Sequence, residues 1–282
     1  MVLLTETWTN EYSDLYVENF EHFVLNRTEN KRNSKRSSGG IIVYLRSKFV
    51  SEETVVFKSN DDILCIKISG SKVALQNDLF VCLCYVVPEN SSRQSVIDQH
   101  TFDRLIEFIT NISVQSTNDF NFVLCGDMNA HTSNLPDFVI NDSCNCCNFQ
   151  VLPEDYIPDL TLERCSQDTG RVNNYGTMLL DICKQTGLRI LNGRFDQDKS
   201  GRFTYVGPQG SSVVDYVITS QNMLDFIESF SVCDPNILSD HCMVDFSFSF
   251  VKDMVDSNVK DMVDSNNITK TCNAESQDYR YV

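Results

Sequence analysis

Short apolar runs separated by polar turns fill the first third of the chain, and these runs are rich in β-branched and aromatic residues. Such side chains pack well on a pleated surface, so the pattern predicts β-strands. We expect them at Val2–Thr5, His22–Leu25, Gly39–Leu45, Thr54–Phe57, Ile63–Ile68 and Leu79–Val87. Strict alternation in the text VDFSFSF predicts another strand within His241–Phe250.

Two later segments change to helical spacing. In Ser95–Ser113 the apolar residues recur three and four positions apart, which predicts an amphipathic helix before an apolar strand at Phe120–Cys125. Tyr175–Thr186 predicts a second helix, with Gly187 as its C-cap. The remaining elements that we expect are strands at Leu188–Leu191, Phe203–Val206 and Val213–Ile218, and a short helix at Met223–Phe230. This mixture of helices and strands indicates the α/β class.

Two segments show neither the alternation of a strand nor the spacing of a helix. Thr132–Asn173 is polar and contains three prolines, and a loop of this length is usually functional or an insertion. Val251–Asn258 reads VKDMVDSN and is repeated letter for letter in Val259–Asn266, but two copies cannot build a solenoid. We therefore expect one domain over residues 1–250 and a low-complexity tail, disordered or weakly helical, over residues 251–282.

Composition narrows the class of protein. No run approaches about 18 uninterrupted apolar residues, and the N-terminal text MVLLTETW is too short and too soon acidic for a signal peptide. These features predict an intracellular protein with no transmembrane helix and no membrane partner. The net charge of −16 argues against nucleic-acid binding through bulk electrostatics, but a nuclease needs only local basic groups. Asn26–Arg36 is one such group, and a solvated loop explains it equally well.

Ten of the twelve cysteines fall into two groups. One group lies in apolar segments and is expected to be buried and reduced: Cys65, Cys82, Cys84, Cys125, Cys183 and Cys242. The other group lies in the long polar segment: Cys144, Cys146, Cys147 and Cys165. Its spacing matches no regular CxxC pair and no histidine lies nearby, so loop cysteines are favoured over a zinc site.

Acidic and polar residues stand at the ends of several apolar runs, in the order Glu6, Asp127 with Asn129, Asp215, and Asp240 with His241. Hydrolytic metal sites are often assembled in this way from distant strand ends, and carboxylates suit Mg²⁺ or Mn²⁺. A histidine that works at a phosphate needs an acceptor on its second nitrogen, which an aspartate supplies. Each piece alone is also explained by an ordinary turn, so the joint occurrence carries the prediction.

Seven segments together match a known pattern: LLTETW, SGGIIVYLR, CLCYVVP, FVLCGDMNAH, NNYGTMLLDICKQTGLRILNGR, GRFTYVGPQGSSVVDYVI and ILSDH. With them the chain resembles the endonuclease/exonuclease/phosphatase superfamily over about residues 3 to 250, and most closely the endonuclease domains of LINE-type (non-LTR) retrotransposons. The resemblance implies a deoxyribonuclease-like fold, a four-layer α/β sandwich of two packed β-sheets flanked by helices. It also implies a DNA-nicking phosphodiesterase that uses Mg²⁺ or Mn²⁺, contacts the DNA phosphate backbone and acts in the nucleus.

The resemblance assigns five catalytic residues. Asp127 matches the aspartate that activates water or faces the leaving group, and Asn129 matches a phosphate-contacting asparagine. Asp215 matches the carboxylate that orients a histidine at the scissile phosphate, and that histidine matches His241. Tyr85 matches a tyrosine beside the same phosphate, although by itself it would be an ordinary strand residue.

The resemblance further implies Glu6 and Asp240 as residues at the metal and Thr204 as a phosphate contact. One feature departs from the family. Family members carry an earlier strand with an asparagine that contributes to the metal site, whereas Met1 stands five residues before Glu6. A missing strand predicts an unpaired edge or a gap beside the site. Two alternatives therefore stay open: a non-catalytic truncated remnant, and a phosphatase or lipid phosphodiesterase of the same superfamily.

Overall fold

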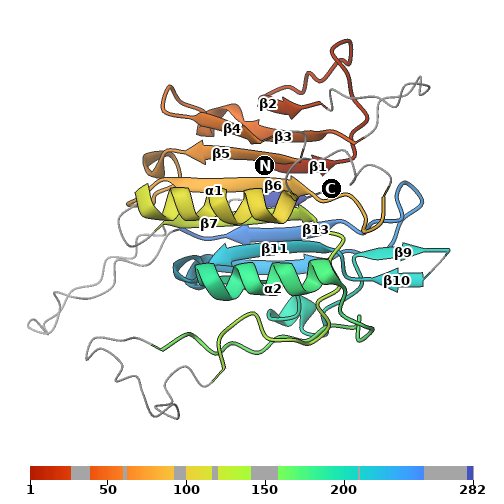
Figure 1. The fold of residues 1–282 in the computed structure, drawn as a ribbon. Helices are drawn as coiled ribbons and strands as arrows, with labels where there is room; N and C mark the ends of the chain where they lie inside the picture. Colours follow the sequence, from red (N-terminus) through yellow and green to blue (C-terminus); the bar gives the residue numbers. More distant parts are fainter. Residues whose placement is uncertain are drawn as a thin grey trace, which may run out of the picture.

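The computed structural model describes residues 1–26, 39–59, 62–91, 100–115, 120–140, 158–208, 210–250 and 278–281. These residues form two six-stranded β-sheets packed against each other, and helices α1 and α2 lie side by side on the outer face of one sheet (Figure 1). The expected α/β sandwich of two packed sheets with flanking helices is thus confirmed. Both α-helices of the described part cover the same sheet, so the outer face of the other sheet has no α-helix in this part of the chain.

The helix-covered sheet has the strand order β4-β5-β6-β7-β11-β8. Its strands are β4 Val55–Ser59, β5 Ile63–Ile68, β6 Leu79–Tyr85, β7 Asn121–Asp127, β11 Asp215–Ser220 and β8 Leu188–Ile190. β6 and β7 run parallel and are joined by α1, Thr101–Gln115, whereas the other pairs are antiparallel. Every residue of β7 is buried, as expected for a strand that is covered on both faces.

The second sheet has the order β12-β13-β14-β1-β3-β2. Its strands are β12 Ile227–Val232, β13 Val244–Phe248, β14 Asp278–Tyr281, β1 Val2–Thr5, β3 Ile41–Arg46 and β2 Phe20–Leu25. A two-stranded ribbon, β9 Tyr205–Gly207 and β10 Gly210–Ser212, projects at one end of the sandwich (Figure 1). Short 3-10 helices occur at Ser47–Phe49, Gly70–Lys72, Asp196–Asp198 and Gln221–Phe226.

Two apolar cores hold the layers together. One lies between the sheets and includes Leu3, Leu83 and Phe246, and the other lies between the helices and their sheet and includes Phe102 and Leu179. The six cysteines expected to be buried are buried and unpaired, as predicted. Cys165 is exposed, whereas the other three loop cysteines lie outside the described residues. No helix of the described part is long and apolar enough to cross a membrane.

Most predicted elements appear within a few residues of their expected bounds. Helix α2, Asn174–Thr186, begins after the N-cap Asn173 and ends at Gly187, whose φ of 70° is the left-handed conformation expected of a C-cap glycine. The prediction of a helix at Met223–Phe230 is wrong. A 3-10 helix occupies Gln221–Phe226, and β12 follows it directly because its residues pair with β13.

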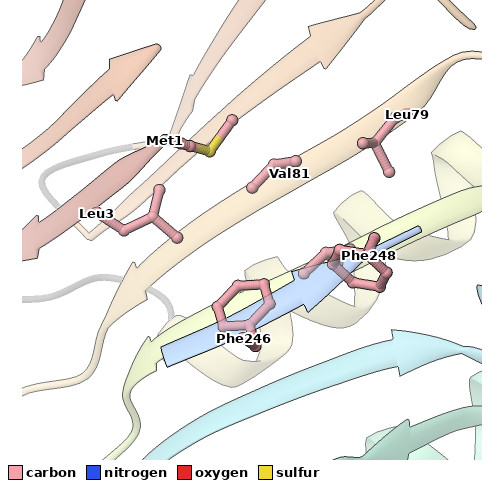
Figure 2. A pocket seen from close by; sticks show the side chains of 7 residues that line it. Met1, Leu3, Leu79, Val81, Phe246 and Phe248 are labelled. Carbon is pink, nitrogen blue, oxygen red and sulfur yellow. The ribbon is translucent and has the colours of Figure 1, made fainter. Parts of the chain in front are cut away.

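The missing strand was expected to leave an unpaired strand edge. The structure shows instead that the edge of β1 is paired. β14 lies between β1 and β13, parallel to the first and antiparallel to the second. Residues 278–281 of the predicted tail are therefore a strand, whereas 251–277 and 282 lie outside the described residues. A small apolar cavity remains between the sheets (Figure 2), lined by Met1, Leu3, Leu79, Val81, Val123, Phe246 and Phe248. Its walls come from the two neighbours of β14 and from β6 and β7.

Candidate active site

Two buried carboxylates form the centre of the site. Asp127, the last residue of β7, is the register partner of Asp215, the first residue of β11. The preceding residue, Gly126, has a φ of 139°, and a Cβ there would lie 1.8 Å from the carbonyl oxygen of Cys84. Only glycine allows this approach of β7 to β6. The local backbone therefore brings Asp127 beside Asp215 at the end of the sheet.

His241 faces this pair from the loop between β12 and β13. Its Nδ1 lies 2.9 Å from Oδ2 of Asp215, which is only 2% exposed. Its backbone forms an isolated bridge with Tyr205, and the two rings meet edge to face with centroids 5.2 Å apart. An acceptor on Nδ1 leaves Nε2 as the free end of the ring. The structure thus provides the hydrogen-bonded pair that an orienting role requires, and the role itself stays a prediction.

Thr204 fixes the backbone of this pair. It is fully buried, and its Oγ1 accepts hydrogen bonds from the N–H groups of Val214 and Asp215, each at 3.0 Å. Its carbonyl oxygen accepts from the N–H of Cys242, the residue after His241. Thr204 therefore holds both partners of the Asp–His pair in place. The phosphate contact predicted for it stays a prediction.

The pKa values show a site with excess negative charge. Burial, and then the charge of Asp215, raise the pKa of Asp127 well above its usual value. Burial alone lowers the pKa of His241, but the hydrogen bond and charge of Asp215 raise it to about 9. Two acids that repel each other in a buried place are a natural position for a cation.

A metal ion fits the residues that are present. Ligand atoms of Asp127, Asp215 and His241 all lie within 4.8 Å of one another. Carboxylate oxygens are the preferred donors for Mg²⁺ and Mn²⁺. Because Asp215 occupies Nδ1 of His241 and favours the protonated ring, this histidine suits a phosphate better than a metal. The oxygen atoms are therefore the better candidates for metal ligands.

Asn129 supports Asp127 directly. Its backbone N–H donates to Oδ1 of Asp127 at 2.9 Å, and its side-chain Nδ2 donates to Oδ2 at 3.1 Å and to the carbonyl oxygen of Val86 at 2.8 Å. Its φ of 45° is left-handed, a conformation that asparagine tolerates better than most residues. The Gly-Asp-x-Asn turn therefore fixes both oxygens of Asp127, and a phosphate contact by Asn129 stays a prediction.

Glu6 and Tyr85 meet across the two sheets. The Tyr85 hydroxyl, at the end of β6, donates a hydrogen bond to Oε1 of Glu6, which follows β1. Glu6 has a φ of 51°, a strained value of the kind that clusters at functional sites. Its charge also raises the pKa of Asp127, which places it near the central carboxylates although it lies outside their 4.8 Å group. A metal contact by Glu6 stays a prediction.

Asp240 lies apart from the central carboxylates. It is exposed, and its carboxylate does not belong to the central group. Its carbonyl oxygen accepts from the N–H of Val206, and its charge contributes to the raised pKa of His241. Its metal role therefore also stays a prediction. Residues 27–38, which include most of the basic stretch Asn26–Arg36, lie outside the described residues.

Sequence reasoning missed two supporting groups. Asn192 donates to the carbonyl oxygen of Asp215 and accepts from Val217, so it holds the start of β11. It follows the apolar run Leu188–Leu191, which is the same signal that marked Asp127. A second acid–histidine pair joins Nδ1 of His131 to Asp168 at 2.8 Å. This pair gave no local signal because 37 residues separate its members.

Comparison with known proteins bears on this geometry. The sequence profile of the endonuclease/exonuclease/phosphatase family matches residues 1–241, whereas no curated protein sequence matches the chain. The AP endonuclease LMAP from Leishmania major is 13% identical, with a TM-score of 0.57 over 85% of this chain and 75% of that one. The 3′ phosphatase NExo from Neisseria, bound to a product DNA hairpin, is 14% identical, with a TM-score of 0.53 over 88% of each chain.

A third structure is the endonuclease domain of TRAS1, a telomere-specific non-LTR retrotransposon. It is 16% identical with a TM-score of 0.46 over 82% of this chain and 81% of that one. The other two likenesses support the fold. The family profile, in contrast, spans the chain from Glu6 to His241, and the structure gathers most of the predicted residues at one end of the sandwich. The chain therefore belongs to the endonuclease/exonuclease/phosphatase family.

Proposed function

We propose that this protein is a phosphodiester hydrolase that uses Mg²⁺ or Mn²⁺ and nicks DNA. The observation that carries the proposal is the Asp215–His241 hydrogen bond directly beside the buried carboxylate of Asp127. Protonated His241 supplies a positive charge and an N–H donor for a phosphate oxygen, and Asp215 keeps the ring oriented. Asp127, fixed by Asn129, is placed to accept a proton from an attacking water.

A divalent cation, held by carboxylates that include Glu6, would stabilise negative charge on the phosphate. The residues of this chain hold the side chains of the cation site in position before a cation binds. Tyr85 positions Glu6 through their hydrogen bond, and Thr204 positions the Asp215–His241 pair. The two carboxylates at the centre repel each other, so binding of a cation also relieves the electrostatic cost of the folded site.

DNA is the substrate that we propose, with the chain derived from a retrotransposon and acting in the nucleus. Support for DNA comes from family membership and from the similarity of fold to NExo and LMAP. Support for the origin comes from the segment NNYGTMLLDICKQTGLRILNGR, which follows the retrotransposon pattern and forms α2 and β8. A 3′ phosphatase activity is the second candidate, because the NExo structure of similar fold carries that activity.

Purified protein should nick supercoiled plasmid DNA with Mg²⁺ and lose this activity with EDTA. Asp127→Ala and His241→Ala should each lower the nicking rate by about 10² to 10⁴-fold, the usual contribution of a positioned acid or base. His22→Ala is the matched control, since His22 is exposed on β2, outside the site. Nicking that survives both site variants would refute the proposal. Release of phosphate from a 3′-phosphorylated oligonucleotide without nicking would favour the phosphatase.

A further inference from the structure

Two large apolar side chains stand in solvent next to the proposed site. Ile237 is fully exposed and Leu238 is 90% exposed, in the loop that joins β12 to β13 and carries His241. Single exposed apolar residues are common on protein surfaces. Two consecutive ones of this size, on the loop of a proposed catalytic histidine, are a candidate contact surface.

The loop has a defined shape. At its base the N–H of Cys233 donates to the carbonyl oxygen of Met243 at 2.8 Å. Near its end the N–H of Val206 donates to the carbonyl oxygen of Asp240, also at 2.8 Å, and the N–H of Leu238 donates to Oδ1 of Asn236. The two apolar residues therefore project from an anchored loop, so little conformational entropy is lost when a ligand covers them.

The position of the loop selects the ligand. Leu238 is three residues from His241, so the two residues are separated by at most about 10 Å. Bases along a DNA strand are spaced by about 3.4 Å, so a strand with a phosphate at His241 places bases within about three steps of Leu238. We propose, on the basis of the DNA substrate proposed above, that Ile237 and Leu238 form an apolar wedge that inserts between neighbouring bases beside the scissile phosphate.

Charge favours bases over a lipid surface. The chain has a net charge of −16, so attraction to DNA phosphates is weak and contacts to bases carry more of the affinity. Peripheral binding to anionic membranes draws on clusters of Lys and Arg, which an acidic chain supplies poorly. Insertion of Leu or Ile between base steps is a known way to bind and kink a duplex.

The test compares the double variant Ile237→Ser/Leu238→Ser with the control Val114→Ser. Val114 is 79% exposed near the end of α1. This helix connects the end of β6 to the start of β7, so Val114 lies toward the end of the strands opposite to Asp127. Binding is measured without Mg²⁺ on a duplex that contains 2-aminopurine, whose fluorescence rises when it unstacks. The double variant should bind roughly 10-fold more weakly and without the fluorescence rise, whereas Val114→Ser should match the wild type.

Two further measurements distinguish a failure of the wedge proposal from a failure of the proposed function. Hydrolysis of bis(p-nitrophenyl) phosphate, which has no neighbouring bases, should be equal in wild type and double variant. Equal plasmid nicking and equal DNA binding by the two proteins would overturn the wedge while leaving the proposed function intact. A wild type inactive on both plasmid and small diester would overturn the proposed function, and the wedge with it. Binding to phosphatidylcholine–phosphatidylserine vesicles that the double variant loses would instead assign the pair to lipid.

Discussion

Asp127 and Asp215 are register partners on adjacent strands, and both are buried. The pKa of Asp127 is raised by burial and by its neighbour, so the folded state holds its proton more tightly than the unfolded chain does. A carboxyl with a raised pKa lowers stability as pH rises above its unfolded value near 3.9. The arrangement that suits cation binding therefore destabilises the metal-free fold at neutral pH.

Asp127→Asn removes this charge and keeps the oxygen that accepts from the Asn129 N–H, while it loses the weaker hydrogen bond from Asn129 Nδ2. At pH 7 without metal we expect the variant to be more stable by about 1 kcal/mol, or about 2–4 °C in Tm, and inactive in nicking. Mg²⁺ should raise the Tm of the wild type more than that of the variant. Asp181→Asn, on the exposed face of α2, is the control and should leave both quantities unchanged. A lower Tm for Asp127→Asn would contradict the repulsion.

His241 gives the opposite dependence on pH. Its pKa is raised from 6.5 to about 9, so the folded state favours the protonated ring. The resulting stabilisation is fully present below pH 6.5 and is lost as pH rises to about 9. His241→Gln keeps a donor toward Asp215 but carries no charge. We expect the Tm advantage of the wild type over this variant to shrink between pH 6.5 and 9. An advantage that stays constant over this range would show that His241 is neutral in the fold.

Periodicity predicted the strands that hold the site, since Asp127 and Asp215 each border an apolar strand. It failed at Met223–Phe230 because the apolar residues there recur at helical spacing although the segment is divided between a 3-10 helix and β12. Pairing with β13 decided in favour of a strand. Residues that act through distant partners gave no periodic signal. Thr204 and the His131–Asp168 pair therefore required a resemblance or the structure itself to be assigned.

β14 was missed for a different physical reason. The text DYRY is four residues long and follows a polar segment, so its own propensity is too weak to predict a strand. Its pairing partners lie in β1 and β13, far away in the sequence. Sheet formation depends on such non-local partners more than helix formation does, which is why α2 could be predicted almost to its ends.

The position of β14 makes a prediction about the stability of the sheet. Removal of residues 251–282 would leave the facing edges of β1 and β13 without a partner. At about 1 kcal/mol for each lost hydrogen bond, we expect a loss on the order of 2–4 kcal/mol and a tendency to aggregate through the open edges. Deletion of residues 259–266 alone removes one octamer but keeps β14, and should leave the Tm unchanged. Hydrogen exchange at β1 should increase only in the first variant, and equal exchange in both would contradict the pairing.

Thr204 offers a test that separates positioning from substrate contact. Thr204→Val removes the oxygen that accepts from the N–H groups of Val214 and Asp215, leaving two buried donors unsatisfied. Each such group costs about 1–3 kcal/mol, so the Tm should fall by several degrees. The rate of nicking should fall through kcat, because Asp215 and His241 lose their alignment. Thr204→Ser keeps the oxygen and should restore both. If Thr204→Val instead raised KM at unchanged Tm, the hydroxyl would act on the phosphate and not on the backbone of Asp215.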